Sequence, residues 1–298
     1  MTRDETTEPR VCRPTVGAAA WNFLVHLRLP FQLVLAPFML WGAALARTPI
    51  SGRFVVAFVV LHVFFYGGTT AFNSHYDRDE GPVGGLANPP PVGPWLLPGS
   101  LVLQGVGLVI AAWVGVAFAL VCVAFAVLGV LYSHPWSRWK GDPWRSWLVV
   151  MFGQGALGTA AGVALREPLQ ITPEIAWGLA AAAVTVGAIY PLTQLFQMEE
   201  DRARGDRTIA IALGRAGTRR AAAGLSAAGA VLMALSAHAG GHTLDAAVLA
   251  ASALPLIAGA AWVSGSSDAG TIYRRVSLFQ IAAGGAFALY AVFRIWRS

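Results

Sequence analysis

The sequence predicts an all-α membrane protein with about nine transmembrane helices. Of its 298 residues, 56% are hydrophobic and only 12% are charged, whereas a soluble domain normally carries about 25% charged residues. Apolar stretches of about 20 residues, the length that a helix needs to cross the bilayer, recur along the chain. Lys and Arg residues also gather on one side of the spans that these stretches define, as they do in polytopic membrane proteins.

The first four spans follow a polar N-terminal tail, expected at residues 1–27, and are expected near 30–46, 53–72, 98–114 and 116–132. The second span leads directly into a group of acidic residues. The third and fourth spans come from one apolar stretch, which Gly115 divides because glycine interrupts a helix.

The other five spans are expected near 147–165, 174–197, 218–238, 244–264 and 276–296. The fifth follows a basic loop, and the sixth leads into a second group of acidic residues. An arginine-rich segment separates the sixth span from the last three. Residues 28–298 are therefore expected to form a single transmembrane domain.

Lys and Arg residues predict the orientation of these spans. The side that holds the N-terminus receives all but five of the 21 Lys and Arg residues, which by the positive-inside rule makes it the cytoplasm. We expect an integral protein of the cell's inner membrane in contact with membrane lipid. The net charge of +6 is then a signal of topology, and no nucleic-acid partner is expected.

Two acidic clusters interrupt the apolar pattern and hold seven of the fifteen carboxylates. The first is Asp77, Asp79 and Glu80 behind Asn73, and the second is Glu199, Glu200, Asp201 and Asp206 behind Gln194 and Gln197. Both clusters follow spans that run toward the cytoplasm, so we expect both at helix C-termini on one face. Carboxylates there are unfavourable by about 0.3–1 kcal/mol each. Solvated loop charges would explain one cluster, but a matched pair indicates function.

The residue types in these clusters are those that bind Mg²⁺, which prefers oxygen ligands and is often held by one or two carboxylates together with substrate phosphates. Asn73 and Asp77 are four residues apart, as are Gln197 and Asp201, so each pair lies on one helix face. The predicted metal ligands are Asn73, Asp77, Asp79, Glu80, Gln197, Glu200 and Asp201. Among them Asn73, Asp77 and Asp201 are predicted to be catalytic.

Basic and aromatic residues near the clusters are candidates for binding a phosphorylated substrate. Arg138 and Lys140 lie in a loop on the same face and suit phosphate oxygens, although anchoring by the positive-inside rule would also explain them. Arg78 and Arg202 each adjoin a carboxylate. With these four, Tyr190 and Gln194 complete the predicted substrate-binding residues, and a tyrosine ring can face a cation.

The motifs resemble those of the UbiA superfamily of intramembrane prenyltransferases. Residues 73–80 are similar to the first aspartate-rich motif of that family, and residues 190–208 are similar to the second. The loop 132–140 is similar to its basic loop, and residues 28–30 to the entry of its first helix. The resemblance covers nearly the whole chain from Arg28 onward.

The resemblance implies a helical bundle around a central cavity that is open toward lipid. An isoprenoid diphosphate would be held there with Mg²⁺ between the two motifs and would ionise to an allylic cation. A lipophilic or aromatic acceptor would capture this cation. The chain departs from the family pattern at Ser74 and Gly81 in the first motif and at Gln197 in the second, which leaves the number of metal ions open.

Two alternatives remain at this point. The first is a membrane terpene cyclase with the same fold, in which the cation is captured by its own chain. The second is a cation-coupled transporter, but such proteins usually hold their carboxylates near the middle of the bilayer in broken helices. The prenyltransferase is the prediction that the sequence favours.

Overall fold

The structure is a bundle of long helices. The computed structural model describes residues 15–297, and within this range it contains no strand beyond an isolated bridge between Val83 and Leu86. In the same range, nine helices are long and apolar enough to cross a membrane: Val16–Leu45, Gly52–Asp77, Leu96–Val114, Val116–Ser133, Pro143–Val163, Pro173–Thr193, Ile209–Ala239, Thr243–Ser264 and Ala269–Arg297. The predicted fold class is confirmed.

Several of these spans are divided into shorter elements. The first comprises α1 (Val16–His26), α2 (Leu29–Gln32), η1 (Leu33–Leu35) and α3 (Ala36–Leu45), and the second comprises α4 (Gly52–Val59), the π-helix η2 (Val60–Gly67) and α5 (Gly68–Asp77). α6 (Leu96–Val114), α7 (Val116–Ser133) and the short η3 (Trp139–Gly141) follow. The fifth comprises α8 (Pro143–Val150), the π-helix η4 (Met151–Leu157) and α9 (Gly158–Val163). The remaining elements are α10 (Pro173–Thr193), α11 (Met198–Ala203), α12 (Ile209–Ala239), α13 (Thr243–Ala251), α14 (Ala253–Ser264) and α15 (Ala269–Arg297).

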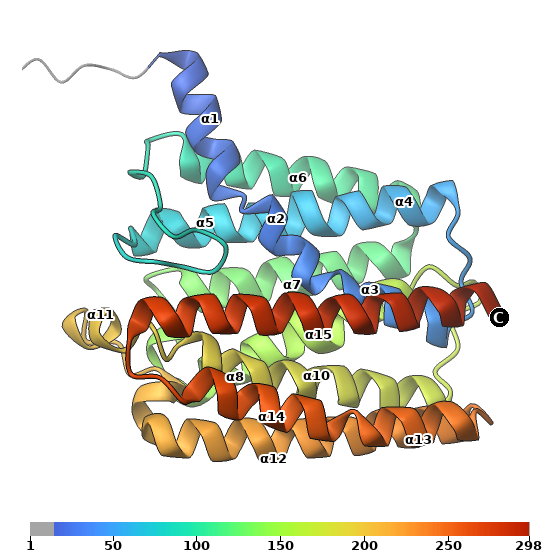
Figure 1. Ribbon diagram of the computed structural model, residues 1–298. Coiled ribbons are helices and arrows are strands. Elements are labelled where there is room, and N and C mark those ends of the chain that lie inside the picture. Colours follow the sequence, from blue (N-terminus) through green and yellow to red (C-terminus); the bar gives the residue numbers. More distant parts are fainter. Residues whose placement is uncertain (1–14, 298) are drawn as a thin grey trace, which may run out of the picture.

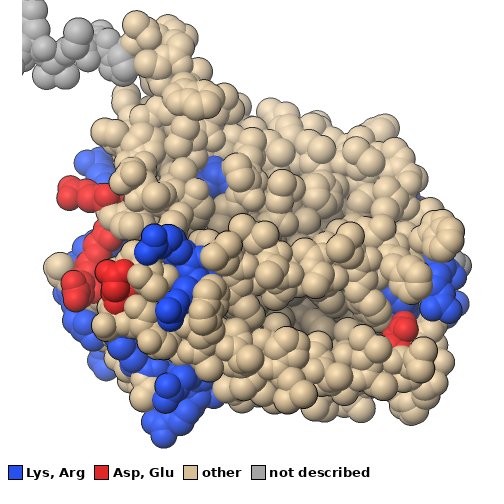
Figure 2. Space-filling view, in the orientation of Figure 1, with Lys and Arg blue, Asp and Glu red and all other residues tan. Residues whose placement is uncertain are grey.

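The spans lie side by side, and the loops that carry the acidic clusters meet at one end of the bundle (Figure 1). This end, on the left of Figure 1, holds the end of α5, the loop 78–95, η3 and α11; we call it the acidic end. Charged side chains gather there in Figure 2, and a smaller group lies at the opposite end, while the middle of the visible face is largely uncharged. The topology thus places both acidic clusters at the same boundary of the membrane-spanning region.

Helices α3 and α9 pack closely through glycine residues, as is common between helices in membranes. A β-carbon added to Gly42 of α3 would meet the backbone carbonyl of Thr159 in α9, and one added to Gly162 would meet the carbonyl of Met39. Large apolar side chains such as Trp41 and Phe65 fill the surrounding core, and both are almost fully buried.

Substituting Gly42→Ala is expected to destabilise the protein by about 1–3 kcal/mol, because the new methyl group cannot fit unless two backbones move apart. Gly105→Ala on α6 is the matched control, since a β-carbon there meets nothing within 4 Å. Thermal unfolding in the same detergent measures both. A Gly42→Ala variant as stable as the control would contradict this packing.

The structure corrects three boundaries. The predicted tail 1–27 contains helix α1 from Val16, while residues 1–14 lie outside the described part. The second span continues beyond residue 72 to Asp77. The sixth ends at Thr193, and the chain begins a separate helix, α11, at Met198.

The second acidic cluster therefore does not lie at a helix C-terminus, as expected, but partly in the first turn of α11. Glu199, Glu200 and Asp201 occupy that turn, where the helix dipole favours carboxylates. Leu195 and Met198 are buried and hold the turn between the two helices against the bundle. The unfavourable dipole interaction argued from the sequence applies only to the first cluster.

Candidate active site

A cavity of about 220 Å³ lies at the acidic end and receives side chains from both acidic clusters. Its polar lining includes Arg28, Asn73, Asp77, Asp79, Tyr132, Ser133, Lys140, Tyr190, Gln194, Gln197, Asp201, Arg204 and Asp206. These residues come from segments spread over most of the chain. The expectation that the two clusters meet at one site is therefore met by the geometry.

The C-terminus of α5 presents the first cluster. Asn73 and Asp77 lie one helical turn apart, and the Asn73 amide oxygen accepts a hydrogen bond of 2.8 Å from the Ser133 hydroxyl of α7. Arg78 caps the helix in the left-handed conformation, with a φ of 50°. The chain turns there, and Asp79 returns to the cavity with a side chain only 4% exposed.

Arg204 joins the two clusters. Its guanidinium donates to Asp79 at 2.7 Å and to Asp201 at 3.1 Å. Burial lowers the pKa of Arg204, but the bonds and charges of Asp79 and the second cluster outweigh this and raise it above the ordinary value. Burial also raises the pKa of Asp201, against the opposing effect of Arg204. One arginine thus neutralises carboxylates that come from segments about 120 residues apart.

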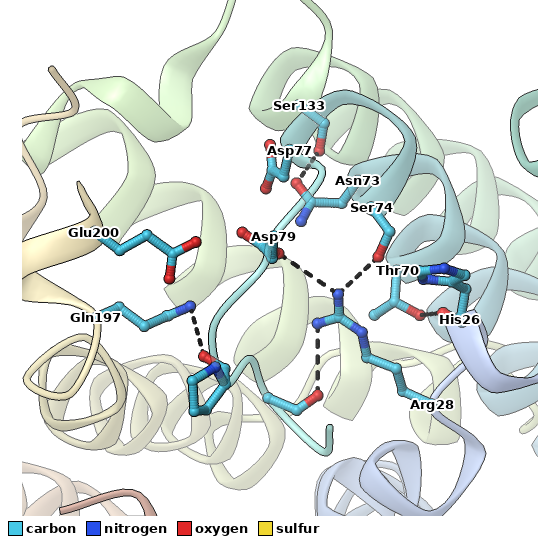
Figure 3. A network of polar contacts seen from close by, with 12 residues as sticks. His26, Arg28, Thr70, Asn73, Ser74, Asp77, Asp79, Ser133, Gln197 and Glu200 are labelled. Carbon is cyan, nitrogen blue, oxygen red and sulfur yellow. Dashed lines mark hydrogen bonds and ion pairs between the residues drawn. The ribbon is translucent and has the colours of Figure 1, made fainter. Parts of the chain in front are cut away.

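Two further cations face the carboxylates. The Lys140 ammonium contacts Asp77; burial lowers the pKa of Lys140 to about 8, and the Asp206 and Asp201 carboxylates oppose that shift. Arg28 lies 3.9 Å from Asp79 and donates to the Ser74 hydroxyl at 2.7 Å (Figure 3). The cavity therefore has positive groups on both sides of the first cluster.

Tyrosine and glutamine side chains form the inner wall of the cavity. The Tyr132 and Tyr190 hydroxyls lie 2.9 Å apart, and Gln194 donates to Tyr190 at 2.8 Å. Gln197 donates to the backbone carbonyl of Pro82 at 3.2 Å and so ties α11 to the loop that follows α5 (Figure 3). These contacts fix the tyrosine rings next to the acidic groups.

The structure brings together eight of the predicted site residues: Asn73, Asp77, Asp79, Lys140, Tyr190, Gln194, Gln197 and Asp201 line the cavity. Five do not line it: Arg78, Glu80, Arg138, Glu200 and Arg202. Glu200 still lies near, because a β-carbon on Gly81 would approach its carboxylate to 2.6 Å, and Figure 3 shows it pointing toward Asp79. Arg138 pairs with Asp206 at 2.9 Å.

The other three residues are exposed and lie outside the cavity lining. Arg78 and Glu80 are exposed on the loop after α5. Arg202 is also exposed and lines a separate surface groove beside Arg215 and Asp268. The predicted site residues did not include Arg204, Ser133 or Arg28. The spacing of Arg204, three and four residues after Asp201 and Glu200, is a signal that could have identified it.

The donor set fits Mg²⁺, although the protein alone does not complete a metal site. Within residues 15–297, no three His, Cys, Asp or Glu side chains gather closely enough to hold a metal ion by themselves. The Asp79 Oδ2 atom is buried and accepts no hydrogen bond from the described residues. Carboxylate and amide oxygens such as these, with substrate phosphates completing the shell, are typical of Mg²⁺.

A second, apolar chamber of about 610 Å³ adjoins the polar cavity. Phe31, Gln154, Tyr190, Thr193 and Gln197 line both spaces, so the two lie side by side. The chamber extends between the first span and α13–α15, the region where the surface is hollowed in Figure 2. A charged group and a long apolar chain of one molecule would fit these two spaces.

Comparison with known proteins identifies relatives of this arrangement. Residues 35–282 match the model of the UbiA prenyltransferase family. No curated protein sequence matches the chain.

Solved structures share the fold. A UbiA homolog from Archaeoglobus fulgidus, bound to GPP and Mg²⁺, matches with a TM-score of 0.69 and 18% identity over 92% of this chain and 99% of that chain. The apo UbiA homolog from Aeropyrum pernix K1 matches with a TM-score of 0.66 and 18% identity over 89% and 98%. A digeranylgeranylglyceryl phosphate synthase matches with a TM-score of 0.63 and 15% identity over 93% and 97%.

Proposed function

Because the chain belongs to the UbiA prenyltransferase family, we propose that it transfers an isoprenoid group from its diphosphate to a lipophilic or aromatic acceptor, with Mg²⁺ as cofactor. The observation that carries the proposal is the junction of two spaces, a cavity with both acidic clusters and an apolar chamber. The Archaeoglobus fulgidus homolog, solved with GPP and with DMAPP in the presence of Mg²⁺, supports this substrate class.

The charges of the cavity support a requirement for a divalent cation. Four aspartates line it, Asp77, Asp79, Asp201 and Asp206, against the three basic residues Arg28, Lys140 and Arg204. A diphosphate would add further negative charge, so it would be repelled unless cations entered with it. Asn73, Asp77, Asp79 and Asp201 would hold the metal, which when bound stabilises the charge that develops on the leaving diphosphate.

The residues of the chain account for the remaining chemistry. Arg28, Lys140 and Arg204 would bind the diphosphate oxygens. The bond between the allylic carbon and the diphosphate oxygen breaks, and the ring faces of Tyr132 and Tyr190 favour the resulting cation. The acceptor then forms a bond to that carbon and loses a proton. The apolar chamber keeps water away from the cation.

We also propose that the acidic end faces the cytoplasm of a cell whose inner membrane holds the protein. The excess of Lys and Arg on that side supports this orientation. The donor diphosphate, which is water-soluble at its head, would then enter from the cytoplasm, and the acceptor from the lipid.

Incubation of the purified protein with geranyl diphosphate and Mg²⁺ tests the proposal. We expect diphosphate release that depends on a lipophilic or aromatic acceptor and that stops in EDTA, because the four aspartates cannot accept the substrate without metal. Chromatography of the products distinguishes transfer from cyclisation. A cyclised hydrocarbon formed without acceptor would contradict the transferase and indicate a terpene cyclase; undiminished turnover in EDTA would contradict the role of Mg²⁺.

A further inference from the structure

The length of the apolar chamber can be derived from the residues of α15 that line it. Tyr273 and Tyr290 both line it, and their separation of seventeen residues corresponds to about 26 Å along a helix. Tyr273 lies at the entrance, because its ring packs edge-on against Phe196 at 5.2 Å, next to Gln197, which also lines the polar cavity. The chamber thus begins at the reaction site and runs most of the way through the membrane.

Tyr290 closes the far end. Its hydroxyl donates to Asp245 at 3.2 Å, and Arg294 donates to Asp245 at 3.0 Å and to Glu174 at 3.1 Å. Glu174 and Arg294 are 8% and 6% exposed. Among the described residues, none of α15 beyond Tyr290 lines the chamber. Along α15, a hydrocarbon chain that extended past Tyr290 would have to separate these buried, paired charges, which is strongly unfavourable.

Aromatic packing makes this end rigid. The Tyr290 ring lies 6.2 Å from Phe287 and 6.1 Å from Trp41, measured between ring centroids. Trp41 is fully buried in the core. The end of the chamber is therefore held both by ion pairs and by stacked rings.

The walls suit a hydrocarbon. Apolar residues such as Val34, Phe279 and Ala283 dominate them. Three hydroxyls on the wall are engaged by their own helices: Thr193 donates to the Tyr190 carbonyl at 2.7 Å, Ser252 to Leu249 at 2.6 Å and Ser277 to Tyr273 at 2.8 Å. These groups need no partner from a ligand.

We propose that this chamber selects a donor of about four or five isoprene units, and that Tyr290 sets the upper limit. An extended peptide unit has three backbone bonds and spans about 3.6 Å. An isoprene unit adds four bonds to an extended chain, so at the same length per bond it spans about 5 Å. A depth of about 26 Å holds about five such units. The inference rests on the proposed function and specifies the length of its donor.

Competition binding to the full-length protein with Mg²⁺ tests the limit, using geranyl, farnesyl, geranylgeranyl, geranylfarnesyl and hexaprenyl diphosphates. We expect affinity to rise at least about tenfold from geranyl to geranylgeranyl, because more carbon is buried, and to rise no further beyond geranylfarnesyl. Equal affinity for geranyl and geranylgeranyl, or a gain that continues to hexaprenyl, would overturn the inference. Absence of binding by every diphosphate would instead contradict the proposed function itself.

Ala283→Phe provides a second, independent test, because Ala283 lines the chamber between Tyr273 and Tyr290. The added ring is expected to weaken geranylgeranyl diphosphate at least about tenfold through the lost burial and to leave geranyl diphosphate within about twofold. Leu289→Phe is the control, since Leu289 is on the same helix, 74% exposed and outside the chamber lining. Equal effects of Ala283→Phe on both ligands, or none on either, would overturn the inference.

Discussion

Asp77→Asn is expected to lower the turnover number by about two to three orders of magnitude, the cost typical of removing one preorganised electrostatic group. Asp77 ends α5, lines the cavity and contacts Lys140. The amide keeps the shape of the side chain but removes the charge that would attract the metal ion. Rates of diphosphate release at several Mg²⁺ concentrations measure the effect, and a higher Mg²⁺ requirement should accompany the loss.

Glu80→Gln makes the same chemical change three residues further along, at a side chain that is exposed and does not line the cavity. The sequence pattern assigned Glu80 to the metal together with Asp77, whereas the geometry separates them. Turnover in Glu80→Gln should remain within about twofold of wild type, as for most exposed surface substitutions. Comparable losses in the two variants would restore Glu80 as a ligand, and full activity in Asp77→Asn would refute the metal site.

The fold was largely predictable because hydropathy over about 20 residues is a strong signal. The count of spans places the two acidic clusters at one end, and the structure places Asp77, Asp79 and Asp201 around one cavity. The number of spans and the side on which each cluster lies do not change when a predicted span boundary is wrong by a few residues. That the two acidic clusters contribute to one site could therefore be inferred from the sequence.

Which residues near the second acidic cluster point into the cavity could not be predicted in the same way. The sixth span was expected to continue to residue 197, but α10 ends at Thr193 and α11 begins at Met198. That break depends on tertiary packing of Leu195 and Met198 in the core, which no local pattern reports. Arg202 was predicted because it adjoins Asp201 in the sequence, whereas it is Arg204, at the C-terminal end of the helix that begins at Met198, that contacts Asp79 and Asp201.

Substitution of Arg204, with Arg202 as its control, is the second change for which we expect a large effect. Arg204→Ala should abolish most activity and lower stability, while Arg202→Ala should change neither by more than about 0.5 kcal/mol, the usual range for exposed surface positions. Arg204 donates to Asp79 and Asp201 and is 26% exposed. Breaking a fully buried ion pair costs about 3–5 kcal/mol; partial exposure of Arg204 places its loss below that range.

The response to Mg²⁺ separates a functional role of Arg204 from a purely structural one. Without Arg204, Asp79 and Asp201 repel each other across the cavity, and a divalent cation can replace the missing charge. The melting temperature of Arg204→Ala should therefore rise more on addition of Mg²⁺ than that of wild type or Arg202→Ala, since a ligand that binds the folded state stabilises it. Equal responses in the three proteins would mean that Asp79 and Asp201 do not share a cation, and the two acidic clusters would then be joined by Arg204 alone.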